Sequence, residues 1–399
     1  MSTARAPNRA LARYGTSIFA EMSALAIEHG AINLSQGFPD FDGPSFLVDD
    51  VVAALRAGKN QYARSMGVPE LVAAIARHRA HFYGEELDAM TDVVVTAGAT
   101  EGIAAAILGL VDPGDEVVVF EPFYDSYPAC VTMAGGVVKT VRLAFPELAL
   151  DEDALRAACS PRTKVLLLNT PHNPTGKVFS RAELDVIARV AHEKDLIVVA
   201  DEVYEHLTFD DARHVPIATL PGMRERTITL SSAGKTFSFT GWKIGWAMGP
   251  ARLVAGVQAA HQFLTFAVST PMQHAVARAL NAIVDGAYLA EFRAEYAARR
   301  EKMLAALSAA GLRAFTPSGT YFVMADFSSL LVEKNRDDDD RAFAKWMTRA
   351  LRVAVIPPSV FYAAAAPRTL LRLAFCKKDA TLDEAARRLG TLRATLETT

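Results

Sequence analysis

Short apolar runs alternate with helical stretches through the middle of the chain, and this alternation limits the fold more than any other feature. Seven runs lie between residues 90 and 250, namely VVVT (93–96), EVVVF (116–120), VVKTVRL (137–143), KVLLLN (164–169), LIVVAD (196–201), TITLSS (227–232) and WAMG (246–249). Most are too short and too continuous for amphipathic helices, so they are typical of strands buried on both faces. One intervening stretch (180–195) opens with Ser180 and Glu183 in capping-box spacing. The alternation predicts an α/β fold with a mostly parallel, seven-stranded sheet.

The two ends of the chain lack this alternation. The first 45 residues contain one helical piece and a turn-rich segment, and the residues after 290 contain a charged helix, short strands and a closing helix. Because 399 residues are long for one hydrophobic core, we expect two domains. We predict a large domain over residues 46–290, and an N-terminal arm with a smaller α+β domain built from residues 1–45 and 291–399. The acidic tract RDDDDR (336–341) is expected to be an exposed loop.

Charge and cysteine content narrow the class of protein. The net charge of −3 provides no basic surface for nucleic acid and no polybasic patch for a membrane. The N-terminal stretch MSTARAPNRALARYG has no apolar core of a signal peptide, and no run reaches the length that spans a bilayer. Cys130, Cys159 and Cys376 are too widely spaced for a zinc site or a disulfide framework. We expect a cytoplasmic protein that handles small metabolites and holds no metal.

Unusual residues follow the carboxyl ends of several predicted strands, where ligands bind in open parallel sheets. The first strand runs into a small-residue turn, Gly98, Ala99 and Thr100, which opens a helix and could bind an anion through backbone N–H groups. By itself this turn is equally a tight connection. Tyr124 follows the second strand, where an aromatic side chain could stack on a planar ring or simply fill the core.

Two further strands end in polar residues. Asn169 and Asn173 flank a proline-bounded turn, and they could bond a polar ligand or only shape that turn. Asp201 ends an all-apolar strand, where a carboxylate is costly unless a cation pairs with it. A protonated ring nitrogen would be such a cation. A metal is less favoured, since no nearby His/Cys/Asp cluster has ligand spacing.

Two lysines and one arginine complete the set. Lys235 lies in a Ser/Ala/Gly-rich turn just after Ser232, so it is either a solvated loop charge or a buried amine with a chemical role. Lys243 could be a surface residue or a second positive charge close to the first. Arg372 sits inside the apolar run TLLRLAF, either pointing outward or clamping a carboxylate.

Pyridoxal phosphate is the one cofactor that needs this whole set. It requires a lysine for covalent attachment, an acid for its ring nitrogen, an aromatic face, donors for its ring oxygen and an anion site for its phosphate. Lys235 would then move the substrate proton as a general base, which demands a lowered pKa. Lys243 would help to lower that pKa and would neutralise phosphate.

The sequence resembles the fold-type I, class I/II aminotransferases over nearly its whole length. The resemblance is carried by INLSQGFPDF (32–41), NQYARSMG (60–67), VTAGATEG (95–102), EPFYDSY (121–127), LNTPHNPTGKV (168–178), DEVYEHL (201–207), ERTITLSSAGKTFSFTGWKIGW (225–246) and LRLAFCKKDATLDEA (371–385). More narrowly, the chain is similar to the kynurenine–oxoglutarate, glutamine and methionine transaminase subgroup. It is also similar to actinobacterial-type N-succinyldiaminopimelate aminotransferases.

This resemblance implies roles for the cofactor site. Lys235 would be the lysine that carries the cofactor and Asp201 the partner of its ring nitrogen, so both would be catalytic together with Tyr204. Asn173 and Tyr204 would bond the ring oxygen, and Tyr124 would stack on the ring. The phosphate would be held by Gly98, Ala99, Thr100, Ser232 and Lys243.

The resemblance also implies a substrate site and a partner. Arg372 and Asn169 would bind the substrate α-carboxylate, with Gly37 approaching from the small domain, which would gate entry of the substrate. Phe19 would lie over the side-chain pocket. Tyr62 would reach the phosphate of the neighbouring subunit, which implies a homodimer with composite sites.

The predicted activity is transfer of the amino group of an L-amino acid to a 2-oxo acid such as 2-oxoglutarate, by a ping-pong mechanism. No second arginine can be assigned to a distal carboxylate, and this favours neutral, apolar or aromatic donors. N-succinyldiaminopimelate transamination and β-elimination from cysteine S-conjugates remain open alternatives. A pyridoxal-binding regulator is disfavoured because Lys235 and Asp201 are both present, and a nicotinamide dehydrogenase because no GxGxxG follows a strand.

Overall fold

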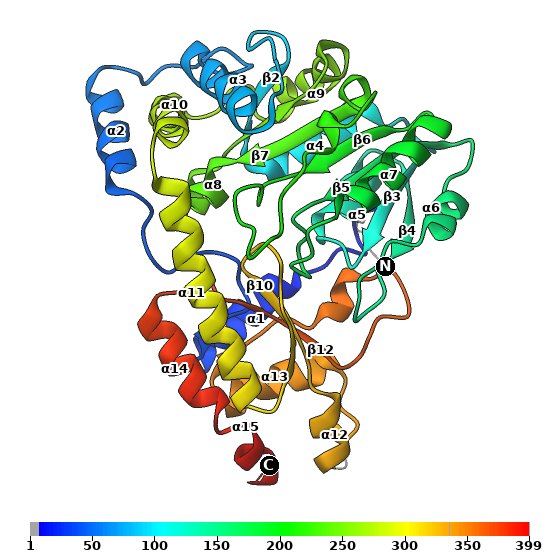
Figure 1. The fold of residues 1–399 in the computed structure, drawn as a ribbon, viewed down its shortest axis with the longest axis vertical. Coiled ribbons are helices and arrows are strands. Elements are labelled where there is room, and N and C mark those ends of the chain that lie inside the picture. The colour runs from blue at the N-terminus through cyan, green and yellow to red at the C-terminus, as the bar shows by residue number, and fades with distance from the viewer. Residues whose placement is uncertain (1–7, 335, 399) are drawn as a thin grey trace, which may run out of the picture.

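The computed structural model describes residues 8–334 and 336–398 (Figure 1). The first seven residues of the N-terminal stretch considered above therefore lie outside the described residues. The middle of the chain forms a layered unit around a large sheet, and both chain ends meet in a second unit below it (Figure 1). Among the described helices, none combines the length and apolar composition needed to cross a bilayer.

The large sheet confirms the predicted seven strands and their mostly parallel arrangement. Its strands lie in the order β2-β8-β7-β6-β5-β3-β4. Their bounds are β2 Val93–Ala97, β3 Glu116–Glu121, β4 Val137–Arg142, β5 Thr163–Asn169, β6 Ile197–Asp201, β7 Thr227–Ser232 and β8 Ile244–Met248. β8 runs antiparallel to both of its neighbours, and the pairs from β7 to β4 are parallel.

Both faces of the sheet are covered, which is why most of its strands read as continuous apolar runs, whereas the edge strand β4 is partly exposed. Successive side chains of a strand point to opposite faces, so Val117 and Val119 pack into one core while Val118 packs into another. The first core lies under α4 (Gly98–Leu110), α5 (Ser126–Met133) and α9 (Ala251–Leu264), and the second under α6 (Glu152–Ala158) and α7 (Arg181–Glu193). The predicted capping box of Ser180 and Glu183 is present at the start of α7.

A third core lies where α3 (Pro69–Tyr83) and α10 (Thr270–Asp285) pack beside β2 and β8. Trp246 of β8 is fully buried in it. α2 (Ser45–Arg56) packs against α10, and the short helix α8 (Ala233–Thr236) follows β7 directly. The sheet therefore presents the ends of β5, β6 and β7 at one edge, with α8 beside them.

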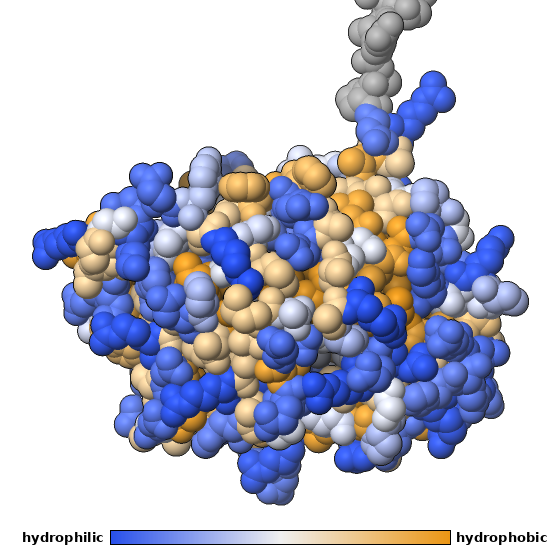
Figure 2. Space-filling view, turned by 90° about the horizontal axis from the view of Figure 1, so that it is seen from above, coloured by the Kyte–Doolittle hydropathy of each residue, from blue (hydrophilic) through white to orange (hydrophobic). Residues whose placement is uncertain are grey.

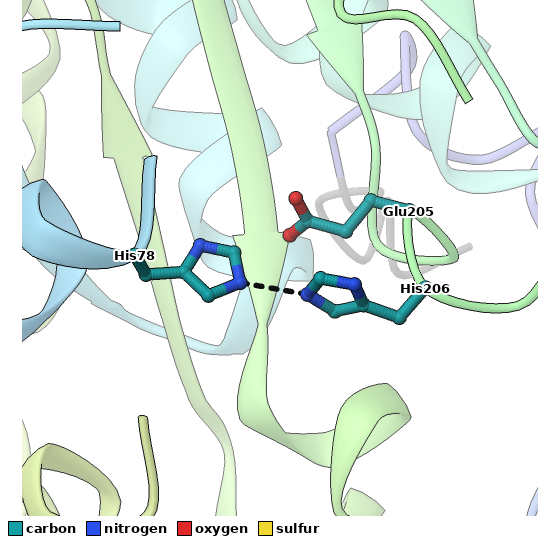
Figure 3. Close-up of side chains that lie close together, drawn as sticks. All are labelled: His78, Glu205 and His206. Atoms are coloured by element: carbon teal, nitrogen blue, oxygen red, sulfur yellow. Dashed lines mark hydrogen bonds between the residues drawn. The ribbon is translucent and has the colours of Figure 1, made fainter. Parts of the chain in front are cut away.

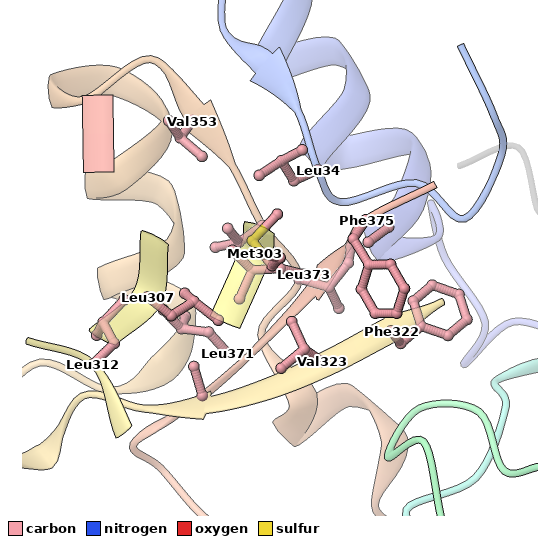
Figure 4. Packing of buried hydrophobic residues seen from close by; sticks show 14 of the residues in the cluster. Leu34, Met303, Leu307, Leu312, Phe322, Val323, Val353, Leu371, Leu373 and Phe375 are labelled. Atoms are coloured by element: carbon pink, nitrogen blue, oxygen red, sulfur yellow. The ribbon is translucent and has the colours of Figure 1, made fainter. Parts of the chain in front are cut away.

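The chain ends form the smaller α+β unit. β10 pairs antiparallel with β9 and β12, and β1 pairs in parallel with β11. Its elements are α1 Ile18–Glu28, β1 Ile32–Asn33, α11 Tyr288–Ala309, β9 Arg313–Phe315, β10 Phe322–Asp326, α12 Ser328–Lys334, α13 Asp340–Ala350, β11 Val353–Ala354, β12 Leu370–Ala374, α14 Asp379–Leu389 and α15 Leu392–Thr398. Figure 4 shows its core, in which Leu34 from the N-terminal side meets Met303 and Val353 from the C-terminal side.

Two local predictions are wrong. The acidic tract is not simply an exposed loop, because Asp339 caps α13 and Asp340 is buried and accepts a hydrogen bond from Ser359 N. The closing helix is two helices, α14 and α15, with Gly390 between them. The domain boundaries after residues 45 and 290 stay a prediction, and α11 runs through the second of them.

Candidate active site

A cavity of about 400 Å³ lies where the ends of β5, β6 and β7 face the smaller unit. It brings together every site residue predicted from the sequence except Tyr62. These residues are Phe19, Gly37, Gly98, Ala99, Thr100, Tyr124, Asn169, Asn173, Asp201, Tyr204, Ser232, Lys235, Lys243 and Arg372. The edge of a parallel sheet thus holds residues from both the middle and the ends of the sequence.

Lys235 lies on α8, directly after β7, and its amine points into the cavity rather than into solvent. Its Nζ donates to the hydroxyl of Tyr321 at 2.9 Å and lies 3.5 Å from the carbonyl oxygen of Gly37. Burial lowers the pKa of Lys235 to about 8, and the positive charges of Lys243 and Arg372 act in the same direction. The amine can therefore lose its proton close to neutral pH, as a general base must.

Asp201 ends β6 beside Asn169, its register partner at the end of β5. Its Oδ2 accepts a hydrogen bond from the hydroxyl of Tyr127 at 2.7 Å. Burial raises the pKa of Asp201, while the hydrogen bond from Tyr127 opposes that shift. A cationic ligand atom beside this carboxylate would restore its charged form, because opposite charges favour each other's ionised state.

Arg372 points inward from β12, which decides between the two orientations that the sequence left open. Its Nη1 donates to Asn173 Oδ1 and its Nη2 to the carbonyl of Ser35, both at 2.9 Å, whereas Nε has no partner. The guanidinium lies 4.1 Å from the centre of the Phe322 ring. Burial lowers its pKa to about 10. Among the described residues Arg372 has no carboxylate within ion-pair distance, so the site is suited to an anionic ligand.

An anion site lies at the start of α4. Gly98 adopts φ +71, which favours glycine, and a Cβ there would come 3.1 Å from Lys243 Nζ. The ammonium of Lys243 donates to Thr100 Oγ1 at 3.2 Å. Ser232, the last residue of β7, also lines the cavity. Backbone N–H groups, a hydroxyl and an ammonium thus meet at a helix N-terminus, which fits a phosphate.

The aromatic residues divide between the cavity and the surface. Phe19 and Tyr124 both line the cavity with their ring centres 6.5 Å apart, and Tyr204 is buried. Tyr62 lies outside the cavity with 83% of its surface exposed, and its ring packs edge-on against Phe266 at 5.2 Å.

The sequence interpretation missed two tyrosines, Tyr127 and Tyr321, which contact Asp201 and Lys235. Tyr127 stands three residues after Tyr124 in the segment EPFYDSY, and the two rings contact each other with centres 5.6 Å apart. Tyr321 is the second residue of the apolar segment TYFVMADF (320–327), and nothing in that segment distinguishes it from a core residue.

A second polar cluster is formed by Glu205 and His206, which directly follow Tyr204 in the sequence, together with His78 of α3. The ligand-type atoms of His78, Glu205 and His206 lie within 4.8 Å of one another, and the two histidines share a hydrogen bond of 2.7 Å (Figure 3). Sequence spacing did not reveal this set because His78 comes from α3. Both oxygens of Glu205 already accept hydrogen bonds, from Arg79 and Ser231. Because both oxygens of Glu205 are used within the protein, we interpret the cluster as a structural network, in which the buried Nδ1 of His78 has no hydrogen-bond partner among the described residues.

Arg79 is the charge that holds this network together. It is fully buried and pairs with Glu85, Glu202 and Glu205. Replacing Arg79 with methionine should lower the free energy of unfolding by roughly 3–5 kcal/mol, because two buried carboxylates lose their cation. Urea unfolding of the variant measures this, with Arg387→Ala on the exposed face of α14 as a control that should change little. A loss below about 1 kcal/mol would contradict a structural role.

Comparison with known proteins identifies the family. Residues 29–389 match the family described as aminotransferase class I and II. A Mycobacterium tuberculosis (H37Rv) protein named probable N-succinyldiaminopimelate aminotransferase DapC is 49% identical over 391 residues, covering 95% of this chain and 96% of that protein. The kynurenine–oxoglutarate transaminase of Dictyostelium discoideum is 41% identical over 411 residues, covering 95% and 94%.

Similarity extends to solved structures. The structure of YbdL from Escherichia coli, described as having a methionine aminotransferase function, superposes with a TM-score of 0.92 at 42% identity and covers 98% of this chain and 100% of that one. Members of the matched family depend on pyridoxal phosphate. The chain belongs to the class I and II aminotransferase family and is an aminotransferase.

Proposed function

We propose that the chain carries pyridoxal phosphate on Lys235 and transfers amino groups from L-amino acids to 2-oxo acids. The observation that carries this proposal is the convergence of three charged side chains, Lys235, Asp201 and Arg372, on one cavity of about 400 Å³. None of the three side chains forms an ion pair with another described residue, and burial disfavours the charged form of each. The amine has a lowered pKa, the carboxyl has a raised one, and the guanidinium lacks a carboxylate.

Different residues of the site would contact the ring nitrogen, the ring oxygen, the ring face and the phosphate of the proposed cofactor. Asp201 would pair with the ring nitrogen, with Tyr127 fixing the orientation of the carboxylate. Asn173 accepts from Arg372 through its oxygen, which leaves its amide N–H₂ free to donate to the ring oxygen together with Tyr204. Tyr124 would face the ring. The phosphate would be held by Gly98, Ala99, Thr100, Ser232 and Lys243.

When bound, pyridoxal phosphate supplies an electron sink for the substrate carbon that loses its proton. Lys235 would accept the proton from the substrate Cα and release it again within the site, since its pKa of about 8 leaves part of the amine neutral near neutral pH. Arg372 holds the substrate carboxylate and thereby orients the Cα–H bond towards Lys235. The same residues would serve both halves of a ping-pong cycle.

The lining supports neutral, apolar or aromatic amino donors. Its described cations are Lys235, Lys243 and Arg372, and the roles above already use all three. Four large aromatic side chains also line the cavity, namely Phe19, Phe38, Tyr124 and Phe322. An acidic donor would need a further cation for its distal carboxylate.

One observation favours a second candidate substrate, N-succinyldiaminopimelate. The Mycobacterium tuberculosis relative named for that activity is 49% identical to this chain over nearly its full length. The proposed donor class and this candidate share the cofactor and the α-carboxylate clamp. They differ only in what occupies the open end of the cavity.

A panel of amino donors distinguishes these readings. Purified protein supplied with pyridoxal phosphate and 2-oxoglutarate should form glutamate fastest from kynurenine, methionine, glutamine or phenylalanine. A specificity constant for N-succinyldiaminopimelate about tenfold or more above those donors would replace the first proposal with the second. Pyruvate released from a cysteine S-conjugate would reveal β-elimination. If no donor forms glutamate, the proposed function is wrong.

We also propose a cytoplasmic homodimer in which Tyr62 reaches the phosphate site of the partner. The ring of Tyr62 packs against Phe266, which follows α9 and is 53% exposed, and Phe263 near the end of α9 is 87% exposed. Figure 2 shows hydrophobic side chains lying between hydrophilic ones on the face seen from above. The three free, buried cysteines support a reducing compartment. Light scattering of the purified protein tests the dimer.

A further inference from the structure

Tyr321 lies between the amine of Lys235 and a backbone carbonyl from the N-terminal part of the chain. Its hydroxyl is 2.9 Å from Lys235 Nζ and 2.5 Å from the carbonyl oxygen of Gly37. The side chain is 1% exposed, and its ring contacts those of Tyr204 and Tyr296. Burial raises the pKa of Tyr321 well above 10, so its phenol keeps its proton.

The direction of these two hydrogen bonds follows from counting protons. A phenol has one proton, and a carbonyl oxygen can only accept, so that proton lies on the line to Gly37. Towards Lys235 the phenol oxygen is therefore an acceptor, and the lysine must donate. A neutral amine that donates to Tyr321 keeps its lone pair unblocked, and the lone pair is what removes a proton from the substrate.

The carbonyl of Gly37 is held firmly enough to fix this arrangement. A Cβ on Gly37 would lie 2.5 Å from Phe322 Cζ and 3.1 Å from Tyr321 Cε2, so the backbone packs directly on these rings. The neighbouring carbonyls of Ser35 and Phe38 accept hydrogen bonds from Arg372 and Lys377 at 2.9 and 2.8 Å. The segment that receives the proton of Tyr321 is thus the same one that Arg372 holds.

We propose that Tyr321 is a positioning residue for proton transfer, which accepts a hydrogen bond from the free amine of Lys235 and keeps its lone pair directed into the cavity. This inference rests on the proposed role of Lys235 as the base. It adds that Lys235, Tyr321 and Gly37 form one chain of hydrogen bonds with a fixed direction, in which Lys235 donates to Tyr321 and Tyr321 donates to the carbonyl of Gly37. Occupation of the carboxylate site next to Arg372 is thereby linked to the orientation of the base.

The test is Tyr321→Phe, which removes the hydroxyl and keeps the ring. We expect kcat to fall by about 10- to 100-fold, as for a misplaced general base. The primary isotope effect with substrate deuterated at Cα should rise, because proton transfer becomes slower. The acidic limb of the kcat profile should move to lower pH, since the ammonium form of Lys235 loses an acceptor.

A second readout does not depend on turnover. In cofactor-free, full-length protein, the rate at which acetic anhydride labels Lys235 at each pH, followed by peptide mass spectrometry, gives the pKa of this amine. That pKa should lie below the wild-type value in Tyr321→Phe. Tyr296→Phe is the matched control, because it removes a buried hydroxyl from a ring packed on Tyr321 and no hydrogen bond joins it to Lys235 among the described contacts.

Unchanged kcat, isotope effect and labelling profile in Tyr321→Phe would overturn the inference and leave the proposed function intact. So would equal changes in Tyr296→Phe, since these would indicate packing alone. A failure of the proposed function would give a different result. If a variant lacking Lys235 kept full activity, Lys235 would not be the base, whatever the effect of Tyr321→Phe.

Discussion

Replacing Lys235 with alanine should lower the rate of amino transfer by roughly 10⁴-fold or more. Two functions are lost together, since the variant lacks both the amine that carries the cofactor and the general base. Borohydride treatment followed by mass spectrometry should find pyridoxyl on the peptide containing Lys235 in the wild type and none in the variant. We expect no replacement by Lys243, whose ammonium donates to Thr100 Oγ1 in the proposed phosphate site.

The matched control is Lys194→Ala, which removes an exposed lysine at the end of α7 and should leave both measurements at wild-type values. Labelling of another lysine in Lys235→Ala, with turnover close to that of the wild type, would show that the assignment of Lys235 is wrong. Circular dichroism and the melting temperature of Lys235→Ala should match those of the wild type. If they change, the loss of activity reports misfolding and does not support the assignment of Lys235.

Replacing Arg372 with alanine should reduce kcat/KM for an amino acid by roughly 10²- to 10³-fold, the effect of leaving a buried carboxylate without its bidentate partner. Arg372→Lys should recover only part of this loss, because an ammonium lacks the planar pair of donors. The sharper measurement compares each amino acid with the amine that lacks its carboxylate. The wild type should prefer the acid strongly, and the variant should lose that preference.

Arg349→Ala, an exposed arginine on α13, serves as the control and should keep the wild-type preference. If Arg372→Ala still discriminated acids from amines as well as the wild type does, the carboxylate would have to be held elsewhere. The most useful follow-up would then be Asn169, whose side chain already bonds the backbone of Asp201 and Asn173.

The strands and the residues at their ends were predictable because each signal is local. A buried parallel strand is a short apolar run, and Asp201 and Lys235 stand out because charged side chains are rare beside such runs. The inward orientation of Arg372 was not predictable in the same way. β12 is buried along its whole length, so no alternation in the sequence tells which face a residue occupies.

Contacts between distant segments explain the rest. Tyr321 meets Lys235 across 86 positions and Gly37 across 284, and no pattern in a single sequence reports such pairs. The same holds for His78 and His206, which are 128 positions apart. Asp340 was read as part of a solvated acidic loop, but its burial depends on Ser359, which comes from a later turn.

The parallel pairing of β1 with β11 has a consequence for how the protein is made. Ile32 pairs with Val353, about 320 residues later, and the N-terminal helix α1 packs against α13 in the same region. At roughly 5–20 residues per second, the ribosome needs about 16–64 s to synthesise the chain between the two strands. During that time the side of α1 that packs on β11 and α13 lacks these partners, so the nascent chain must shield it by transient contacts or by a chaperone. The catalytic cavity is completed only when the last tenth of the chain emerges.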